Sequence, residues 1–378
     1  MLPDYHNGSI VNLMSSIAKS FRVKTLYNPL KILPPKKLKK NIVLIVIDGL
    51  GYNYLKGKNT ILNKFMKGSM TSVFPSTTGA AIPTFFTGVP AQQHAFTGWF
   101  VFLKEIGVVA KSLPFSPRLG GPSFSKAGIK IKNILTQDAF TSKINAKSFI
   151  ISGKEIADSD FSKLMSKKAK MLKYKNLNEF FSQLRKAMNF SNSKKYVYAY
   201  WSKLDSLNHN YGVNSKKSEK HLKVLIKKLN IFIKNLRKDT TLIITSDHGF
   251  VNTPKDRVIK LEDHPKLKES LTLPLCGESR TVYCYVHPSK ADYFEKYVKE
   301  NLSKYCNIYK SPDLIGKNYF GLFKPNPNLF NRVGDYILIC KENYIIKDKL
   351  ENEKRENHIG HHSGISEDEM LVPLIVVN

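Results

Sequence analysis

The stretch NIVLIVIDGLG, residues 41–51, indicates the fold class of this chain. Its six apolar residues, 42–47, follow one another without a polar interruption. A short run of this kind is typical of a strand buried on both faces, as in a parallel sheet covered by helices. The run ends at Asp48, and open α/β sheets bind their ligands at the carboxyl ends of their strands. A carboxylate at that edge therefore predicts a site beside this strand.

The chain alternates strand-like and helix-like segments up to about residue 250. Further strands are predicted over 69–74, 147–151, 196–201, 241–245 and 371–377, and helices over 10–21, 78–87, 178–188 and 215–236. This alternation predicts an α/β fold with a mostly parallel central sheet and helices on both of its faces.

The pattern changes between residues 255 and 340. Two strands are predicted there, over 281–287 and 335–340, with a helix over 291–302 between them. A further buried strand follows at 371–377, so both ends of the chain are expected in one core. We interpret residues 1–254 and 341–378 as a catalytic α/β core and residues 255–340 as a small inserted α+β cap subdomain.

The net charge is strongly positive. The chain carries 60 lysine and arginine residues against 30 acidic ones, a formal charge of +30, and only eight of the 60 are arginine. We interpret this as a lysine-rich composition with solvated faces. The alternative is a field that attracts phosphate-bearing substrates. Base recognition favours arginine and aromatic side chains, which are scarce in the lysine clusters at 36–40 and 167–175, so no dedicated nucleic-acid binding is expected.

Targeting signals and cysteine motifs are not evident. No segment approaches the roughly 20 continuous apolar residues of a membrane-spanning helix, and the N-terminus lacks the apolar region of a signal peptide. The four cysteines, at 276, 284, 306 and 340, form no C-x-x-C pair, which argues against a zinc knuckle. A cytoplasmic location is therefore expected.

Six side chains of metal-binding type follow predicted strands or lie in a glycine-rich loop: Asp48, Asp205, His209, Asp247, His248 and His362. Asp205 and His209 are four residues apart, so on a helical turn they face the same way and can bind one cation. His362 lies in the sequence GHHSG, where His361 is the alternative ligand. Each pattern alone has a plain structural explanation, such as a capping aspartate, but together they predict a two-metal site.

Thr78 is the candidate nucleophile of this site. Two cations about 3.5–4 Å apart can clamp the attacking and leaving oxygens of an in-line displacement at phosphorus. A threonine hydroxyl becomes nucleophilic when a metal lowers its pKa. Thr78 opens the helix predicted over 78–87, whose N-terminal N–H groups can bind phosphoryl oxygens. Zinc suits the mixed aspartate and histidine set best, and manganese or iron are compatible.

Five motifs in this order resemble the alkaline phosphatase superfamily, and within it the type I phosphodiesterase/nucleotide pyrophosphatase group. They are IVLIVIDG at 42–49, VFPSTT at 73–78, YWSKLDSLNH at 200–209, TSDHG at 245–249 and HSGISEDEMLVP at 362–373. The resemblance implies an alkaline-phosphatase-like fold and two divalent metal ions.

The resemblance also divides the site residues into two groups. It implies that Asp48, Thr78, Asp247 and His248 surround one metal, and that Asp205, His209 and His362 hold the other. One family spacing, counted from Pro75, falls on Val73, which cannot react. The spacing of ten residues before Gly88, which follows Thr87, selects Thr78, with Thr77 as the alternative.

Three further residues are weaker candidates for substrate contacts. His94 and Trp99 follow the nucleophile helix. They either have a structural role or wall the pocket, where Trp99 could stack on a nucleobase. Arg280, in the sequence CGESR, matches a cap motif of the family and would touch a phosphate, and a surface ion pair is its alternative.

The predicted function is that of a metal-dependent phosphodiesterase or nucleotide pyrophosphatase acting on a small phosphate-containing substrate through a phosphothreonine intermediate. A phosphomonoesterase or phosphonate hydrolase on the same site is one alternative. A cationic binding protein without catalytic activity is another, although the complete set of metal donors argues against it.

Overall fold

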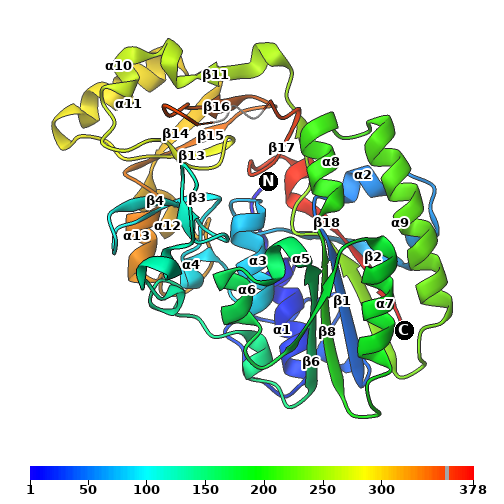
Figure 1. The fold of residues 1–378 in the computed structure, drawn as a ribbon. Coiled ribbons are helices and arrows are strands. Elements are labelled where there is room, and N and C mark those ends of the chain that lie inside the picture. Colours follow the sequence, from blue (N-terminus) through cyan, green and yellow to red (C-terminus); the bar gives the residue numbers. More distant parts are fainter. Residues whose placement is uncertain (354–356) are drawn as a thin grey trace.

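Two seven-stranded sheets form the framework of the computed structural model, which describes residues 1–353 and 357–378 (Figure 1). The larger helical layers cover the first sheet, and the second sheet lies beside its upper edge in the view of Figure 1. Among the described residues, no helix combines the length and the apolar character that crossing a bilayer requires.

The first sheet has the strand order β2-β18-β9-β1-β8-β6-β7. Its strands are β1 (Asn41–Ile47), β2 (Met66–Thr71), β6 (Lys147–Gly153), β7 (Lys170–Tyr174), β8 (Lys195–Trp201), β9 (Thr240–Thr245) and β18 (Leu371–Val377). β1 pairs in parallel with β8 and β9, and β6 pairs in parallel with β7 and β8. β18 is antiparallel to both of its neighbours. The predicted mostly parallel central sheet is therefore confirmed.

Helices cover both faces of this sheet, as predicted. The side chains of Ile42, Leu44 and Val46 in β1 join one apolar cluster with α1 (Ile10–Ser20) and α3 (Thr78–Thr87). The alternate side chains, Val43, Ile45 and Ile47, join a second cluster with α7 (Leu177–Met188) and α9 (Lys216–Lys234). β1 carries apolar residues without alternation because each face of the strand is buried under a helical layer. Figure 1 shows these two layers on opposite sides of β1.

The second sheet is antiparallel, with the strand order β14-β15-β13-β12-β3-β4-β5. Its strands are β3 (Phe100–Leu103), β4 (Val108–Lys111), β5 (Ser116–Pro117), β12 (Cys276–Gly277), β13 (Thr281–Cys284), β14 (Cys306–Lys310) and β15 (Tyr336–Cys340). The prediction confined this unit to 255–340, and the structure extends it to β3, β4 and β5. Gly277 of β12 pairs with Phe100 of β3, a partnership across more than 170 residues that no local pattern reveals.

Shorter elements complete the chain. The helices are α2 (Tyr52–Lys56), α4 (Ala91–His94), α5 (Lys154–Ala157), α6 (Asp160–Met165), α8 (Lys203–Tyr211), α10 (Pro265–Lys268), α11 (Ala291–Asn301), α12 (Ser311–Gly316), α13 (Pro327–Arg332) and α14 (Glu367–Met370). The strands are β10 (Val251–Asn252), β11 (Val258–Lys260), β16 (Ile345–Lys347) and β17 (Gly360–His361).

Candidate active site

The polar residues that follow the central strands lie at one edge of the first sheet. Asp48 directly follows β1, and Asp247 and His248 come just after β9. Asp205 lies in the first turn of α8, which begins two residues after β8. Because β8, β1 and β9 are parallel neighbours, their carboxyl ends meet, and these side chains meet with them.

The first group of candidate ligands consists of Asp48, Asp247 and His248. One ligand atom from each of the three side chains lies within 4.8 Å of the others. Nε2 of His248 is 3.4 Å from Oδ1 of Asp48 and 3.5 Å from Oδ2 of Asp247. All three residues are buried. Two carboxylates and an imidazole in this arrangement match the donors that zinc and similar ions prefer.

The second group consists of Asp205, His248 and His362, whose ligand atoms also lie within 4.8 Å of one another. Nε2 of His209 is 3.4 Å from Oδ1 of Asp205, and the ring of His209 is 5.1 Å from that of His362. The rings of His248 and His362 stack at 3.8 Å. The structure thus brings together all six predicted metal donors. It differs from the division that the resemblance implies in one respect, because His248 is within reach of both groups.

The surrounding hydrogen bonds orient two of the imidazoles. Nδ1 of His209 donates to the carbonyl of Gly360 at 2.9 Å, and Nδ1 of His248 donates to the carbonyl of Gly249 at 3.0 Å. A backbone carbonyl on Nδ1 is the usual partner of a metal-binding histidine, since it fixes the tautomer and leaves the Nε2 lone pair free. Both rings therefore present Nε2 to the centre of the cluster.

Three buried atoms of the cluster have no hydrogen-bond partner among the described residues: Oδ1 of Asp205, Oδ2 of Asp247 and Nδ1 of His362. Buried polar atoms are nearly always paired, and an orphan calls for an explanation such as an ion. Three orphaned atoms with lone pairs in one cluster fit cations that would accept those lone pairs. The residues present therefore fit a metal centre.

The electrostatics of the cluster also favour cations. Burial raises the pKa of Asp48 well above its usual range, and the neighbouring carboxylates of Asp205 and Asp247 raise it further. Burial also acts to raise the pKa of Asp205, but His209 beside it outweighs that effect and lowers the pKa. Several carboxylates gathered in a buried space repel one another, and bound divalent cations relieve this repulsion.

Thr78 presents its hydroxyl to this cluster. Its Oγ1 lies 3.0 Å from Nε2 of His248 and 3.5 Å from Oδ1 of Asp48, and the residue is partly exposed. Thr77, the alternative nucleophile, is buried and donates its hydroxyl to Oε1 of Glu278 at 2.5 Å. Of the two neighbouring threonines, Thr78 is the one whose hydroxyl contacts metal-type residues.

The three weaker candidates lie in different surroundings. His94 is fully buried, with Nε2 3.2 Å from the hydroxyl of Thr84 and Nδ1 accepting the Phe96 amide, and burial lowers its pKa to about 3. Its ring therefore supports α3 from inside the protein, which is the structural role that the sequence offered as an alternative to lining a pocket. Trp99 is partly exposed, and its backbone N–H donates to Oε1 of Glu278 at 2.8 Å.

Arg280 does not occupy the predicted phosphate-contacting position. Its guanidinium is buried and forms an ion pair with Glu369, from Nε to Oε1 at 2.6 Å and from Nη2 to Oε2 at 3.0 Å. Nη1 and Nη2 also donate to the carbonyls of Tyr344 and Glu342. All three nitrogens are therefore engaged within the protein. The ion pair is buried, whereas the sequence suggested a surface pair as the alternative.

Three residues near the site were missed by sequence reasoning. Glu278 receives the hydrogen bonds from Thr77 and Trp99, and Tyr200 donates its hydroxyl to Oδ2 of Asp48. The ring of His358 lies 4.6 Å from that of His209. Burial raises the pKa of Glu278, although its hydrogen bonds and the nearby histidines act in the opposite direction. Glu278 and His358 follow no strand of the first sheet, so only the folded chain reveals their place.

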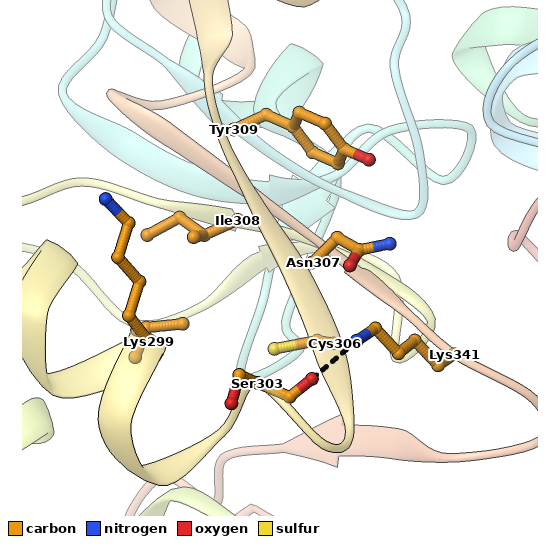
Figure 2. A pocket seen from close by; sticks show the side chains of 8 residues that line it. Lys299, Ser303, Cys306, Asn307, Ile308, Tyr309 and Lys341 are labelled. Atoms are coloured by element: carbon orange, nitrogen blue, oxygen red, sulfur yellow. Dashed lines mark hydrogen bonds between the residues drawn. The ribbon is translucent and has the colours of Figure 1, made fainter.

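A separate hollow of about 260 Å³ lies between α11 and β14 in the second sheet, away from these residues. Figure 2 shows its lining, with Lys341 donating to the carbonyl of Ser303. Lys299 at its rim forms an ion pair with Glu295. None of the candidate metal donors lines this hollow, so the candidate chemistry remains at the edge of the first sheet.

Comparisons with known proteins bear on the fold and the family of the chain. Comparison with curated protein sequences finds no match. Among solved structures, murine ectonucleotide pyrophosphatase/phosphodiesterase 5 is 18% identical with a TM-score of 0.67, over 88% of this chain and 87% of the other. An inactive threonine-to-alanine variant of that protein, in complex with AMP, is 18% identical with a TM-score of 0.66 over the same shares.

A third similar structure is phosphonoacetate hydrolase from Sinorhizobium meliloti 1021 in complex with phosphonoformate. It is 15% identical with a TM-score of 0.62, over 90% of each chain. At these identities the structural likeness establishes the fold alone. The family described as type I phosphodiesterase/nucleotide pyrophosphatase matches residues 42–365, which is most of the chain. The chain therefore belongs to the type I phosphodiesterase/nucleotide pyrophosphatase family of metal-dependent phosphoric ester hydrolases.

Proposed function

We propose that this protein hydrolyses small-molecule phosphodiesters or phosphoanhydrides with Thr78 as the nucleophile and two divalent cations as cofactors. One observation carries the proposal. The partly exposed hydroxyl of Thr78 lies 3.0 Å from Nε2 of His248, within a cluster that contains three orphaned buried acceptor atoms. A hydroxyl among metal donors and at a helix N-terminus has the surroundings that activation toward phosphorus requires.

Two sets of residues would hold the cations. Asp48, Asp247 and His248, together with the hydroxyl of Thr78, would hold one. Asp205, His209 and His362 would hold the other, with His248 close to both sets. Zinc suits this mixture of imidazole and carboxylate best, and manganese or iron are compatible. When bound, such ions supply Lewis acidity and lower the pKa of a coordinated hydroxyl.

The reaction would proceed in two displacements at phosphorus. Oγ1 of Thr78 attacks the phosphorus, the P–O bond to the leaving group breaks, and the phosphoryl group becomes an ester of Thr78. Water then attacks the same phosphorus and the bond to Thr78 breaks, which restores the hydroxyl. Each displacement inverts the configuration, so the product should retain the configuration of the substrate overall.

Nucleotides are the favoured substrate class. The murine structural relative is recorded in complex with AMP. In this chain, Glu278 holds the backbone of Trp99 close to the nucleophile helix, and the indole ring of Trp99 is partly exposed. An indole at that place could stack on a nucleobase. Phosphonate hydrolysis is the second candidate, because the bacterial structural relative is a phosphonoacetate hydrolase.

The test compares bis-p-nitrophenyl phosphate with p-nitrophenyl phosphate and phosphonoacetate, with and without a chelator. We expect diester turnover that stops in chelator and returns with zinc. Thr78→Ala should lose at least about a thousandfold in kcat, because removing a nucleophile leaves only binding and electrostatic effects. A matched control is Thr87→Ala at the other end of α3, where the hydroxyl donates to the carbonyls of Pro83 and Val89 and accepts the Val89 amide.

A p-nitrophenyl phosphoryl group on the peptide that contains Thr78, found by mass spectrometry after acid quenching during turnover of bis-p-nitrophenyl phosphate, would support the covalent step, because the diester keeps its second ester group after the first displacement. Full activity of Thr78→Ala, or undiminished activity in chelator with no metal detected by elemental analysis, would refute the proposal. A monoester rate far above the diester rate would move the assignment to a phosphomonoesterase.

A further inference from the structure

Four consecutive residues, Gly277–Arg280, run from the end of β12 to the start of β13. They contact the loops around the candidate active site. Glu278 accepts hydrogen bonds from Thr77 and from the Trp99 amide. The next residue, Ser279, lies with its hydroxyl 3.2 Å from Nδ1 of His361, beside His362. Arg280 pairs with Glu369. These residues, hereafter the 277–280 segment, are therefore one place where the second sheet touches the catalytic loops, and Thr281 of β13 extends the contact by donating to the carbonyl of Ser363.

Three glycines hold the backbone of this segment against the nucleophile helix. A Cβ atom added to Gly79 would lie 2.5 Å from the backbone carbonyl of Gly98, and one added to Gly98 would lie 3.2 Å from the backbone of Gly277. Real Cβ atoms do not approach backbone atoms as closely as 2.5 Å, so position 79 needs glycine. Gly79 directly follows Thr78, Gly98 directly precedes Trp99, and Gly277 directly precedes Glu278. The close backbone contacts between the three glycines therefore fix Thr78, Trp99 and Glu278 relative to one another.

The hydrogen bond made by the hydroxyl of Thr77 departs from the usual pattern of helix capping. Thr77 is the N-cap of α3, with φ −143° and ψ 151°. A threonine at this position usually accepts a hydrogen bond from the amide of the second or third helical residue. Here the side chain makes no such bond, and its hydroxyl is turned toward Glu278, donating to Oε1. Glu278 therefore holds the hydroxyl of Thr77 away from the N-terminus of α3, the helix that Thr77 caps.

Two amides at the start of α3 have no acceptor among the described residues. The N–H groups of Ala80 and Ala81 bond to the carbonyl of Thr77. Within the described chain, no acceptor is recorded for the N–H groups of Thr78 or Gly79. These are the amides of the proposed nucleophile and of the residue after it. Free amides beside a nucleophile are what a phosphoryl oxygen needs when negative charge develops on it.

We infer that Glu278 is a positioning residue for phosphoryl transfer. It holds the hydroxyl of Thr77 off the N-terminus of α3, keeps the Gly79 amide open for a phosphoryl oxygen next to the amide of Thr78, and fixes Trp99 beside them. The inference rests on the proposed role of Thr78. It assigns to the second sheet a direct share in the geometry of the nucleophile.

The decisive test is a double-mutant cycle with Glu278→Ala and Thr77→Val. In Glu278→Ala, the hydroxyl of Thr77 is free to cap the helix and compete for an amide. We expect kcat to fall by about 10- to 100-fold with KM within about threefold, since small misplacements at a reacting centre have effects of that size. Glu278→Gln keeps an acceptor oxygen for both donors and should stay within about fivefold of the wild type.

Thr77→Val removes the competing hydroxyl while keeping the shape of the side chain. Introduced into Glu278→Ala, it should raise kcat at least about threefold, a non-additive rescue that a merely structural role of Glu278 would not produce. Glu300→Ala, on the exposed face of α11, is the control for removing a carboxylate. Bound metal and the circular dichroism spectrum are measured for every variant.

Three results would overturn the inference. The first is a folded, metal-loaded Glu278→Ala with wild-type kcat. The second is a double variant no faster than Glu278→Ala. The third, which applies even if Glu278→Ala does not fold, is a folded Glu278→Gln that loses more than about tenfold in kcat, a loss larger than the retained acceptor permits. Retained activity in Thr78→Ala would instead refute the proposed nucleophile, so the two failures are distinguishable.

Discussion

The buried ion pair between Arg280 and Glu369 allows a quantitative prediction for Glu369→Gln. Glu369 is 0% exposed, and its carboxylate accepts four hydrogen bonds. Oε1 accepts from Nε of Arg280 at 2.6 Å and from the Gly364 amide at 2.7 Å. Oε2 accepts from Nη2 of Arg280 at 3.0 Å and from the Ser366 hydroxyl at 2.6 Å. The carboxylate therefore uses all of its lone-pair positions.

Glutamine has the same shape but one carbonyl oxygen, so two of the four donors would face an NH2 group. A hydrogen bond that involves a charged group contributes about 1.5–3 kcal/mol, so two lost bonds predict a loss of about 3–6 kcal/mol. Removing one partner of a buried ion pair independently predicts about 3–5 kcal/mol. We expect Glu369→Gln to lower the free energy of unfolding by about 3–5 kcal/mol, a large part of the stability of a typical domain.

The assay is urea unfolding followed by tryptophan fluorescence and circular dichroism. Asp158→Asn is the matched control, because the ion pair between Asp158 and Lys173 is exposed and its loss should not move the midpoint measurably. Glu369→Gln should unfold at a clearly lower urea concentration than this control. Equal midpoints for Glu369→Gln and Asp158→Asn would refute the reasoning.

Three further predictions concern pH, substrate and metal. Because burial lowers the pKa of His94 to about 3, and the unfolded ring titrates near about 6.5, the unfolded state binds more protons between these values. Stability should therefore fall with decreasing pH by about 1.4 kcal/mol per unit. His94→Gln should flatten this dependence relative to a control variant, His6→Gln, at an exposed position, and equal slopes would contradict the argument. Trp99→Ala should raise KM about tenfold for a p-nitrophenyl nucleotide ester but little for methyl p-nitrophenyl phosphate, because a stacked base contributes about 1–3 kcal/mol; equal increases would exclude stacking. Asp205→Asn should lower the bound metal by about one ion per chain in elemental analysis, since ligand loss weakens one site, and unchanged stoichiometry would argue against two separate cations.

Much of the first sheet could be predicted because its signals are local. The apolar run at 42–47 needs only its own residues to indicate a doubly buried strand, and the structure shows β1 at Asn41–Ile47. The helix predicted over 78–87 is α3, and the strand predicted over 371–377 is β18. The strand predicted over 69–74 lies instead at Met66–Thr71. Residues beyond Thr71 leave the sheet toward the active site, where the Ser72 amide bonds to the carbonyl of Met370.

The candidate ligands could be named from sequence for the same reason. Asp48, Asp205 and Asp247 follow strands or open a helix after one, and parallel strands bring such positions to a common edge. The roles of Arg280 and His94 could not be read in this way. Whether a guanidinium meets a phosphate or Glu369, and whether an imidazole lines a pocket or lies under a helix, depends on neighbours that are distant in sequence.

The sequence by itself determined the α/β core, the family and the set of metal-type side chains, because short-range hydrophobic patterns and strand ends encode them. Only the tertiary structure decided that β3, β4 and β5 join the second sheet, that His248 lies close to both ligand groups, and that Glu278 receives the hydroxyl of Thr77. These features arise from packing between segments more than 40 residues apart, where shape and burial select the partner. No periodicity within either segment records that choice.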